Sequence, residues 1–164
     1  MDEKGYLLQL QICSAYIKAD SVSIKQIILI KNDTSLKKRL KKESCSHDEF
    51  PIKGLLNRLT SYFNGEPVDF GYECDISHHT ELGKNIIDVV KGIPYGKTMT
   101  YEQVAEIIGN KNLRRAVGST VGKNRCPIVI PCHRVVGKGG KLTGFSADGG
   151  IKLKEELLKL EGAI

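Results

Sequence analysis

Hydrophobic positions in the first half of the chain alternate between strand-like and helix-like spacings. Leu8, Leu10 and Ile12 recur at every second residue, which is the period of a half-buried strand. Residues 22–30 form a β-branched, apolar run that is typical of a second strand. Residues 31–49 are polar and rich in lysine, and they predict a loop or a short exposed helix. This half therefore mixes strands with helices.

A helical stripe and a further alternating run complete this half. Apolar residues between 52 and 63 fall on one helical face, which Gly65 and Pro67 end. Apolar residues then alternate over 68–74 and predict another strand. The pattern changes from strand to helix near residues 77–80. We therefore expect an α+β domain over residues 1–78, which scaffolds a second domain over residues 79–164.

The second half is predicted to be mainly helical. Thr100 and Gln103 form a capping box at the start of one short helix, and apolar spacing over residues 113–121 predicts the next. Because a short turn joins them, they have the outline of a helix-turn-helix. The helices alone leave an ordinary αα-hairpin as the alternative. A last helix is expected at about residues 151–160.

The charge distribution indicates a polyanionic partner. The chain has 25 Lys and Arg against 19 Asp and Glu, a net charge of +6. No acidic residue lies between Glu106 and Asp148. That stretch carries eight basic residues, Lys111, Arg114, Arg115, Lys123, Arg125, Arg134, Lys138 and Lys141, so the remainder of the chain has a net charge of −2. A long segment without carboxylates favours nucleic acid as the partner.

Cysteine usage and the N-terminal sequence suggest a reduced, cytoplasmic protein. The five cysteines are an odd number without a CxxC pair, which fits free thiols better than a disulfide framework. The chain opens on acidic residues without a long apolar run, so neither a secretory signal nor a membrane span is expected. Cysteines and histidines of the first half lack the close spacing of metal ligands, and we expect no required metal.

The segment whose side chains are most suggestive of catalysis is residues 126–137. Its apolar residues 128–130 predict a buried extended stretch, which Pro131 turns so that Cys132 emerges beside His133. A thiol reacts as its thiolate, so a nucleophilic role for Cys132 requires its thiol to be ionised and exposed. Side chains adjacent in sequence point apart, so His133 would act through a water and need a third residue to orient it. A buried thiol beside a surface histidine is the alternative that this pair alone leaves open.

Residues 130–137, IPCHRVVG, closely resemble the active-site motif of the O6-alkylguanine-DNA alkyltransferase family. The resemblance covers about residues 80–162 in the family's order and spacing, with matches that include Tyr95, Gly96, Thr100, Tyr101, Arg115, Ala116, Val117, Gly118, Asn124, Pro127, Ile128, Gly144, Phe145, Ser146, Leu157, Leu158, Glu161 and Gly162. It implies a ribonuclease H-like N-terminal domain followed by a winged helix-turn-helix-like DNA-binding domain.

The resemblance also implies an activity, namely DNA repair without a cofactor. An alkyl group would move irreversibly from O6-alkylguanine in DNA, with O4-alkylthymine as a further candidate, to Cys132 in a single turnover. Flipping of the damaged nucleotide would precede transfer, because O6 of a paired guanine lies inside the duplex. The expected partner is the minor groove of double-stranded DNA. The protein is expected to act as a monomer, and clustering on DNA stays open.

Five residues receive catalytic roles from the resemblance. Cys132 would accept the alkyl group, His133 would act as a base through a water, and Glu161 would orient His133. Tyr101 would donate a proton or hydrogen bond to N3 of guanine. Asn124 would tie together the turn that holds the cysteine.

Further residues would bind the DNA and the flipped base. Arg115 would fill the vacated stack, and small residues would let the helix enter the minor groove. The full DNA-binding set is Arg115, Tyr101, Ala116, Gly118, Ser119, Lys123 and Arg134. Pro127 and Phe145 would wall the base pocket, carbonyls of Cys132 and Val135 would bind the exocyclic amine, and the amide of Ser146 would meet O6.

Two other function classes compete with this interpretation. One is a DNA-binding protein without transfer chemistry, either a lesion sensor or a regulator. The other is a Cys–His hydrolase or acyltransferase, which would turn over many times and need no DNA surface. Modification of Cys132 by a methylated duplex discriminates among the three.

Overall fold

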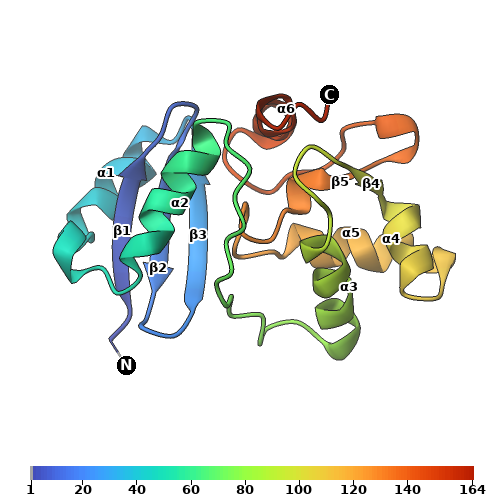
Figure 1. Ribbon diagram of the computed structural model, residues 1–164, viewed down its shortest axis with the longest axis horizontal. Coiled ribbons are helices and arrows are strands. Elements are labelled where there is room, and N and C mark those ends of the chain that lie inside the picture. Colours follow the sequence, from blue (N-terminus) through green and yellow to red (C-terminus); the bar gives the residue numbers. More distant parts are fainter. Residues whose placement is uncertain (1) are drawn as a thin grey trace.

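The computed structural model describes residues 2–164 and begins with a three-stranded antiparallel sheet (Figure 1). Its strands are β1 (Lys4–Gln9), β2 (Ser14–Ala19) and β3 (Ile24–Ile30), in the order β1-β2-β3. Helices α1 (Thr34–Lys42) and α2 (Lys53–Phe63) follow, with the 3-10 turn η1 (His47–Glu49) between them. The α+β character expected for this half is confirmed.

The two helices cover opposite faces of the sheet. On the β2 strand, Ala15 and Ile17 are fully buried in the main core together with Leu55 and Leu59 of α2. The intervening Tyr16 instead packs with Leu40 of α1 in a separate cluster. Successive side chains of a strand point to opposite faces, so the central strand is buried on both.

Two strand predictions in this half are wrong. The first strand ends at Gln9, and residues 10–12 form the turn into β2, where Leu10 N–H donates to the Cys13 carbonyl at 3.1 Å. The alternation continued through the turn because Leu10 and Ile12 also pack on the core. Residues 68–74 make only an isolated bridge, between Cys74 and Ile24.

The second of these errors has a local cause. The Arg58 guanidinium donates to the carbonyls of Asp69 and Phe70, which removes acceptors that a strand ladder would use. Gly71 adopts a φ of 60°, which interrupts the extended backbone. The segment therefore runs between the two halves and pairs with the sheet only at the Cys74–Ile24 bridge.

The second half is mainly helical, as predicted. It contains α3 (Glu81–Lys91), α4 (Tyr101–Ile107), α5 (Arg114–Gly122) and α6 (Gly150–Leu160), the short parallel pair β4 (Met99–Thr100) and β5 (Val135–Val136), and the 3-10 turns η2 (Lys111–Leu113), η3 (Cys132–Arg134) and η4 (Lys138–Gly140). The capping box of α4 is present: Gln103 N–H donates to Thr100 Oγ1 at 3.1 Å, and Thr100 N–H donates to Gln103 Oε1 at 2.7 Å. Helices α4 and α5 join through η2 in the expected helix-turn-helix outline.

One hydrophobic core runs through both halves of the molecule. It joins Ile17 of the sheet and Leu59 of α2 to Ile86 of α3, Val117 of α5 and Leu157 of α6. The segment between α2 and α3, where the domain boundary was placed, crosses between the two halves (Figure 1). Within residues 2–164, no helix combines the length and apolar character needed to cross a membrane.

Candidate active site

A tight turn presents Cys132 at the start of η3. Residues 128–130 are not extended as predicted, because Ile128 has a φ of 76° and Pro127 bridges back to Ile130. Asn124 holds this turn from both sides: its Nδ2 donates to the Ile130 carbonyl at 2.9 Å, and its Oδ1 accepts from Cys126 N–H at 2.9 Å. The position of Asn124 thus matches its predicted role.

The Cys132 thiol is buried rather than exposed. Only 7% of the residue is accessible, and burial raises the pKa of the thiol, although a hydrogen bond with Asn124 and the positive charge of Lys154 oppose this shift. The expectation of an exposed thiolate is therefore wrong for the resting protein. Because desolvation disfavours the charged form, the resting sulfur carries its proton.

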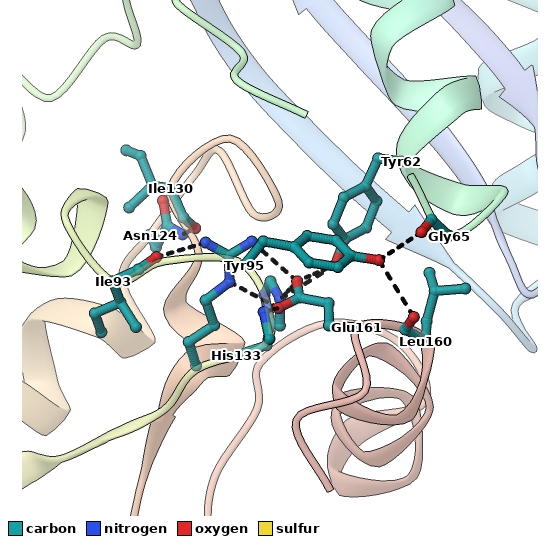
Figure 2. Close-up of polar contacts among 11 residues, drawn as sticks. Tyr62, Gly65, Ile93, Tyr95, Asn124, Ile130, His133, Leu160 and Glu161 are labelled. Carbon is teal, nitrogen blue, oxygen red and sulfur yellow. Dashed lines mark hydrogen bonds and ion pairs between the residues drawn. The ribbon is translucent and has the colours of Figure 1, made fainter. Parts of the chain in front are cut away.

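A buried cluster around Glu161 orients His133 (Figure 2). His133 Nε2 lies 2.6 Å from Glu161 Oε1, and the Tyr62 hydroxyl donates to the same oxygen at 2.6 Å. Burial would raise the pKa of Glu161, but hydrogen bonds from His133 and Arg134 outweigh it and lower the pKa to about 2. The carboxylate therefore accepts a proton-bearing Nε2 of His133.

The other ring nitrogen of His133 is left free to accept a proton. Its Nδ1 is buried and has no hydrogen-bond partner among the described residues. Burial lowers the pKa of His133, with Glu161 opposing, so the imidazole is neutral at pH 7. A neutral ring with Nε2–H held by a carboxylate presents Nδ1 as a base. The structure thus provides the His133–Glu161 arrangement that was predicted.

Arg134 is buried and paired, contrary to its predicted place on a DNA-binding surface. The residue is 8% exposed, and its Nε and Nη2 donate to the two Glu161 oxygens at 2.9 and 3.0 Å. Its Nη1 donates to the Ile93 carbonyl at 2.6 Å. A buried guanidinium requires a buried acceptor, and Glu161 supplies it. Arg134 therefore supports the His133–Glu161 pair, which we call the relay.

Sequence reasoning missed two functional side chains, Tyr62 and Lys154. Tyr62 is fully buried on α2, and its position within an apolar helical stripe gave no signal of a polar role. Lys154 is 1% exposed and donates from Nζ to the carbonyls of Val135 at 2.7 Å and Thr143 at 3.0 Å. Burial lowers the pKa of Lys154 to about 8, with Cys132 opposing. Its spacing from Leu157 and Leu158 on the apolar face of α6 could have identified it.

Two cavities converge on Cys132. One, of about 260 Å³, is lined by Tyr101, Gly118, Val121, Gly122, Cys132, Gly144, Phe145 and Ser146. The other, of about 330 Å³, lies between the halves and is lined by Cys132, Asn124, Arg125, Pro127, Leu36, residues 26–29 and residues 145–148. Phe145 and Pro127 therefore stand where a pocket wall was predicted, and Ser146 lines both cavities. The sulfur is buried but not sealed.

Val135 lies outside the linings of both cavities. It is fully buried, and its carbonyl accepts the short hydrogen bond from Lys154. Its backbone also pairs with Met99 in the β4–β5 ladder. The substrate contact predicted for Val135 is therefore not prepared in this arrangement.

The predicted DNA-binding residues of α5 share an accessible face. Arg115, Ser119 and Lys123 are exposed, and Ala116 and Gly118 are half-buried. A cavity of about 310 Å³ beside them is lined by Thr100, Tyr101, Glu102, Arg114, Arg115, Gly118 and Lys138. Tyr101 also lines the smaller cavity at Cys132, with its hydroxyl 3.4 Å from the Thr143 carbonyl. It thus connects the outer face of α5 to the sulfur.

Comparison with known protein families and structures identifies the relatives of this chain. Residues 81–163 match the family model described as the DNA binding domain of 6-O-methylguanine DNA methyltransferase. A methylated-DNA–protein-cysteine methyltransferase of Methanosarcina acetivorans is 42% identical over 117 residues, which are 71% of this chain and 72% of that protein. One from Methanosarcina mazei is 32% identical over 95% of both chains.

Solved structures agree over nearly the full length. The crystal structure of Mycobacterium tuberculosis O6-methylguanine methyltransferase aligns with a TM-score of 0.79 at 28% identity, covering 99% of this chain and 94% of that one. A second Mycobacterium tuberculosis structure, in complex with DNA, aligns with a TM-score of 0.76 at 29% identity over 97% and 92% of the two chains. This chain therefore belongs to the methylated-DNA–protein-cysteine methyltransferase family, and it is a DNA repair enzyme that transfers the methyl group of O6-methylguanine to a cysteine.

Proposed function

We propose that Cys132 is the acceptor cysteine and that His133, Glu161, Tyr101 and Asn124 support its reaction. The observation that carries this assignment is the convergence of two cavities on a thiol beside a buried, carboxylate-held histidine. Cys126, also buried, donates from Sγ to the Ile24 carbonyl at 3.7 Å and lines neither cavity.

The proposed reaction is a direct displacement at an sp³ carbon. The thiol proton passes through a water to Nδ1 of His133, and the sulfur forms a bond to the alkyl carbon as the bond from that carbon to O6 breaks. The electron pair of the broken bond stays with the guanine, and the Tyr101 hydroxyl stabilises the negative charge by donating a hydrogen bond to N3. Solvent then carries the proton from His133 to the guanine. The product is a stable thioether, so each protein molecule repairs one lesion.

The raised pKa of the Cys132 thiol fits this order of events. Desolvation keeps the sulfur protonated and unreactive until a flipped guanine fills the cavity. The neutral His133 then takes the proton, and the charge of Glu161 stabilises the imidazolium that results. Asn124 keeps the turn in place while the sulfur moves from thiol to thioether.

The exposed face of α5 is the proposed DNA contact. Arg115 stands at the start of this helix and faces solvent, which supports the proposal that it occupies the stack that a flipped nucleotide leaves. Ala116, Gly118 and Ser119 add little bulk on this face, which suits the minor groove of double-stranded DNA, and Lys123 is available to a phosphate. O4-alkylthymine is a second substrate to test.

We also propose a division of the monomer into domains at residues 1–78 and 79–164. The first part contains the three-stranded sheet with α1 and α2, and the second contains α3 to α6 with the β4–β5 pair. The connecting segment carries no complete strand. The continuous core and the bond from Tyr62 to Glu161 make the two parts work as one unit.

Mass spectrometry of the protein after incubation with an O6-methylguanine duplex tests the function. The expected result is one methyl-sized gain on the Cys132 peptide, which does not increase with excess lesion. Cys132→Ser should keep duplex binding and lose transfer. Tight binding with unchanged mass would instead indicate a lesion sensor, and repeated turnover of substrate would indicate a hydrolase or acyltransferase. Either result would overturn the proposal.

A further inference from the structure

We infer that Asp148 is a positioning residue that holds the wall of the alkyl-transfer pocket against the first half of the chain. The inference rests on the proposed function of Cys132. Asp148 lies in the loop that follows Phe145 and Ser146, and this loop lines both cavities at the sulfur. What fixes the loop therefore fixes the space in which a flipped base would meet Cys132.

The anchor consists of one carboxylate oxygen and three backbone amides. Oδ2 of Asp148 accepts N–H groups from Lys31 at 2.9 Å, Asn32 at 2.6 Å and Asp33 at 2.8 Å. These amides belong to the turn between β3 and α1, more than a hundred residues away in sequence. We call this set of contacts the Asp148 latch. Hydrogen bonds from amides to an ionised acceptor are stronger than those between neutral groups.

A second contact brings the same two segments together. Lys31 Nζ forms an ion pair with Glu156, which lies in the second turn of α6. Gly149 allows the close approach, since a Cβ there would lie 3.1 Å from the Lys31 side chain and 3.0 Å from Leu153. The latch therefore joins the turn to the loop and to the start of α6.

The loop needs an anchor because its backbone is permissive. Gly144, Gly149 and Gly150 have φ values of 48°, 103° and 51°, so glycines in the left-handed region stand at both ends of the loop. Glycine restricts the backbone less than any other residue. Phe145 and Ser146 lie between these hinges and are only partly buried or exposed. Contacts at Asp148 thus hold the far end of the wall, whereas Lys154 Nζ holds its start by donating to the Gly144 carbonyl at 3.4 Å.

A released loop should change two reactions of Cys132 in opposite directions. Cys132 is only 7% exposed as a residue, so a small electrophile in solution reaches its sulfur with difficulty. Loosening the wall would admit such a reagent more readily. Methyl transfer needs the base to be held in line with the sulfur, and a loose wall would slow it. A general loss of stability would not produce this opposed pair of effects.

The test compares Asp148→Ala with two other variants. Asp148→Asn keeps an acceptor oxygen but loses the charge, so its effects should be intermediate. Asp20→Ala is the matched control: its Oδ1 accepts N–H groups from Val22 and Ser23, both at 2.8 Å, in the turn between β2 and β3, and Asp20 lines neither cavity at Cys132. Two rates are measured, iodoacetamide labelling on the Cys132 peptide and single-turnover transfer from an O6-methylguanine duplex. Affinity for undamaged duplex and the urea midpoint are measured alongside.

Asp148→Ala should speed iodoacetamide labelling about tenfold and slow methyl transfer about tenfold, where each factor corresponds to about 1.4 kcal/mol. Asp20→Ala should leave both rates unchanged at a comparable loss of stability. Unchanged rates in Asp148→Ala, or equal slowing in both alanine variants, would overturn the latch. If the wild-type protein transfers no methyl group, the proposed function fails, and iodoacetamide labelling still decides whether the latch shields the sulfur.

Discussion

Replacement of Glu161 by glutamine should disable the relay and weaken the fold together. The carboxylate accepts from the Tyr62 hydroxyl, His133 Nε2, two nitrogens of Arg134 and the Gly96 amide, the last at 3.1 Å. Glutamine has nearly the same shape but only one acceptor oxygen and no charge. Its amide nitrogen would face donors, and Arg134 would keep a buried charge without a counterion.

The expected loss of stability follows from the depressed pKa of Glu161. Relative to an ordinary value of 4.5, a folded pKa of about 2 corresponds to about 3 kcal/mol of stabilisation by the ionised form at neutral pH. Breaking a buried ion pair by removing one partner costs about 3–5 kcal/mol, which agrees. With a urea m-value of about 2 kcal/mol per molar, the unfolding midpoint should fall by about 1.5 M.

The transfer rate should fall by at least about 100-fold, which is the lower range for loss of a general base. Without Glu161, neither the Nε2–H tautomer nor the imidazolium of His133 is favoured. Single-turnover transfer from an O6-methylguanine duplex, measured well below the unfolding temperature, reports this loss. Labelling of Cys132 by iodoacetamide over a range of pH then shows whether thiol ionisation has shifted.

Glu155→Gln on the same helix is the matched control. Glu155 is half-buried, with 42% of its side chain accessible, and it pairs with Lys159 at 2.5 Å. This substitution should leave the urea midpoint and the transfer rate unchanged. If Glu161→Gln transferred methyl groups at a rate close to wild type, or unfolded at the same midpoint as Glu155→Gln, the role given to Glu161 would be refuted.

Three further predictions address the relay and the DNA face. Tyr62→Phe removes one hydrogen bond to Glu161 without changing volume, so urea unfolding should show a loss of about 1.5–3 kcal/mol; an unchanged midpoint would contradict the bond. Arg115→Ala should slow transfer from duplex DNA but not from free O6-methylguanine base, and equal effects on both substrates would exclude a flipping role. Because the folded pKa of Glu161 lies below 4.5, its stabilisation is complete above that pH and declines as pH falls toward 2. Urea midpoints recorded across this window should converge for wild type and Glu161→Gln, and parallel curves would show that another group titrates.

Locally encoded features of the second half could be predicted from the sequence. The capping box at Thr100, the glycine that closes α5 and the proline before Cys132 each act on neighbouring backbone, so their meaning lies within a few residues. The adjacency of Cys132 and His133 likewise marked the reactive segment. Asn124 lies six residues from the Ile130 carbonyl that it binds, which is close enough in sequence for a local motif to indicate the contact.

Errors arose where a side chain has two physical uses. Arg134 looks the same in sequence whether it faces a phosphate or a buried carboxylate, and only the position of Glu161 decides between them. Exposure of Cys132 was inferred from its chemistry, whereas the fold buries the residue and burial raises the pKa of its thiol. Alternating apolar residues around Leu10 predicted a strand, although they pack as well from a turn.

The contribution of the first half to the site could not have been inferred from its residue types. Tyr62 occupies a core position on α2, and its hydroxyl finds Glu161 only because the two halves share one core. At Asp148 the partners are the backbone amides of residues 31–33, and every amino acid except proline supplies the same N–H. The identities of those three residues therefore carry no trace of the contact. Only the path of the β3–α1 turn determines it, so the first half acts on the pocket through its backbone shape.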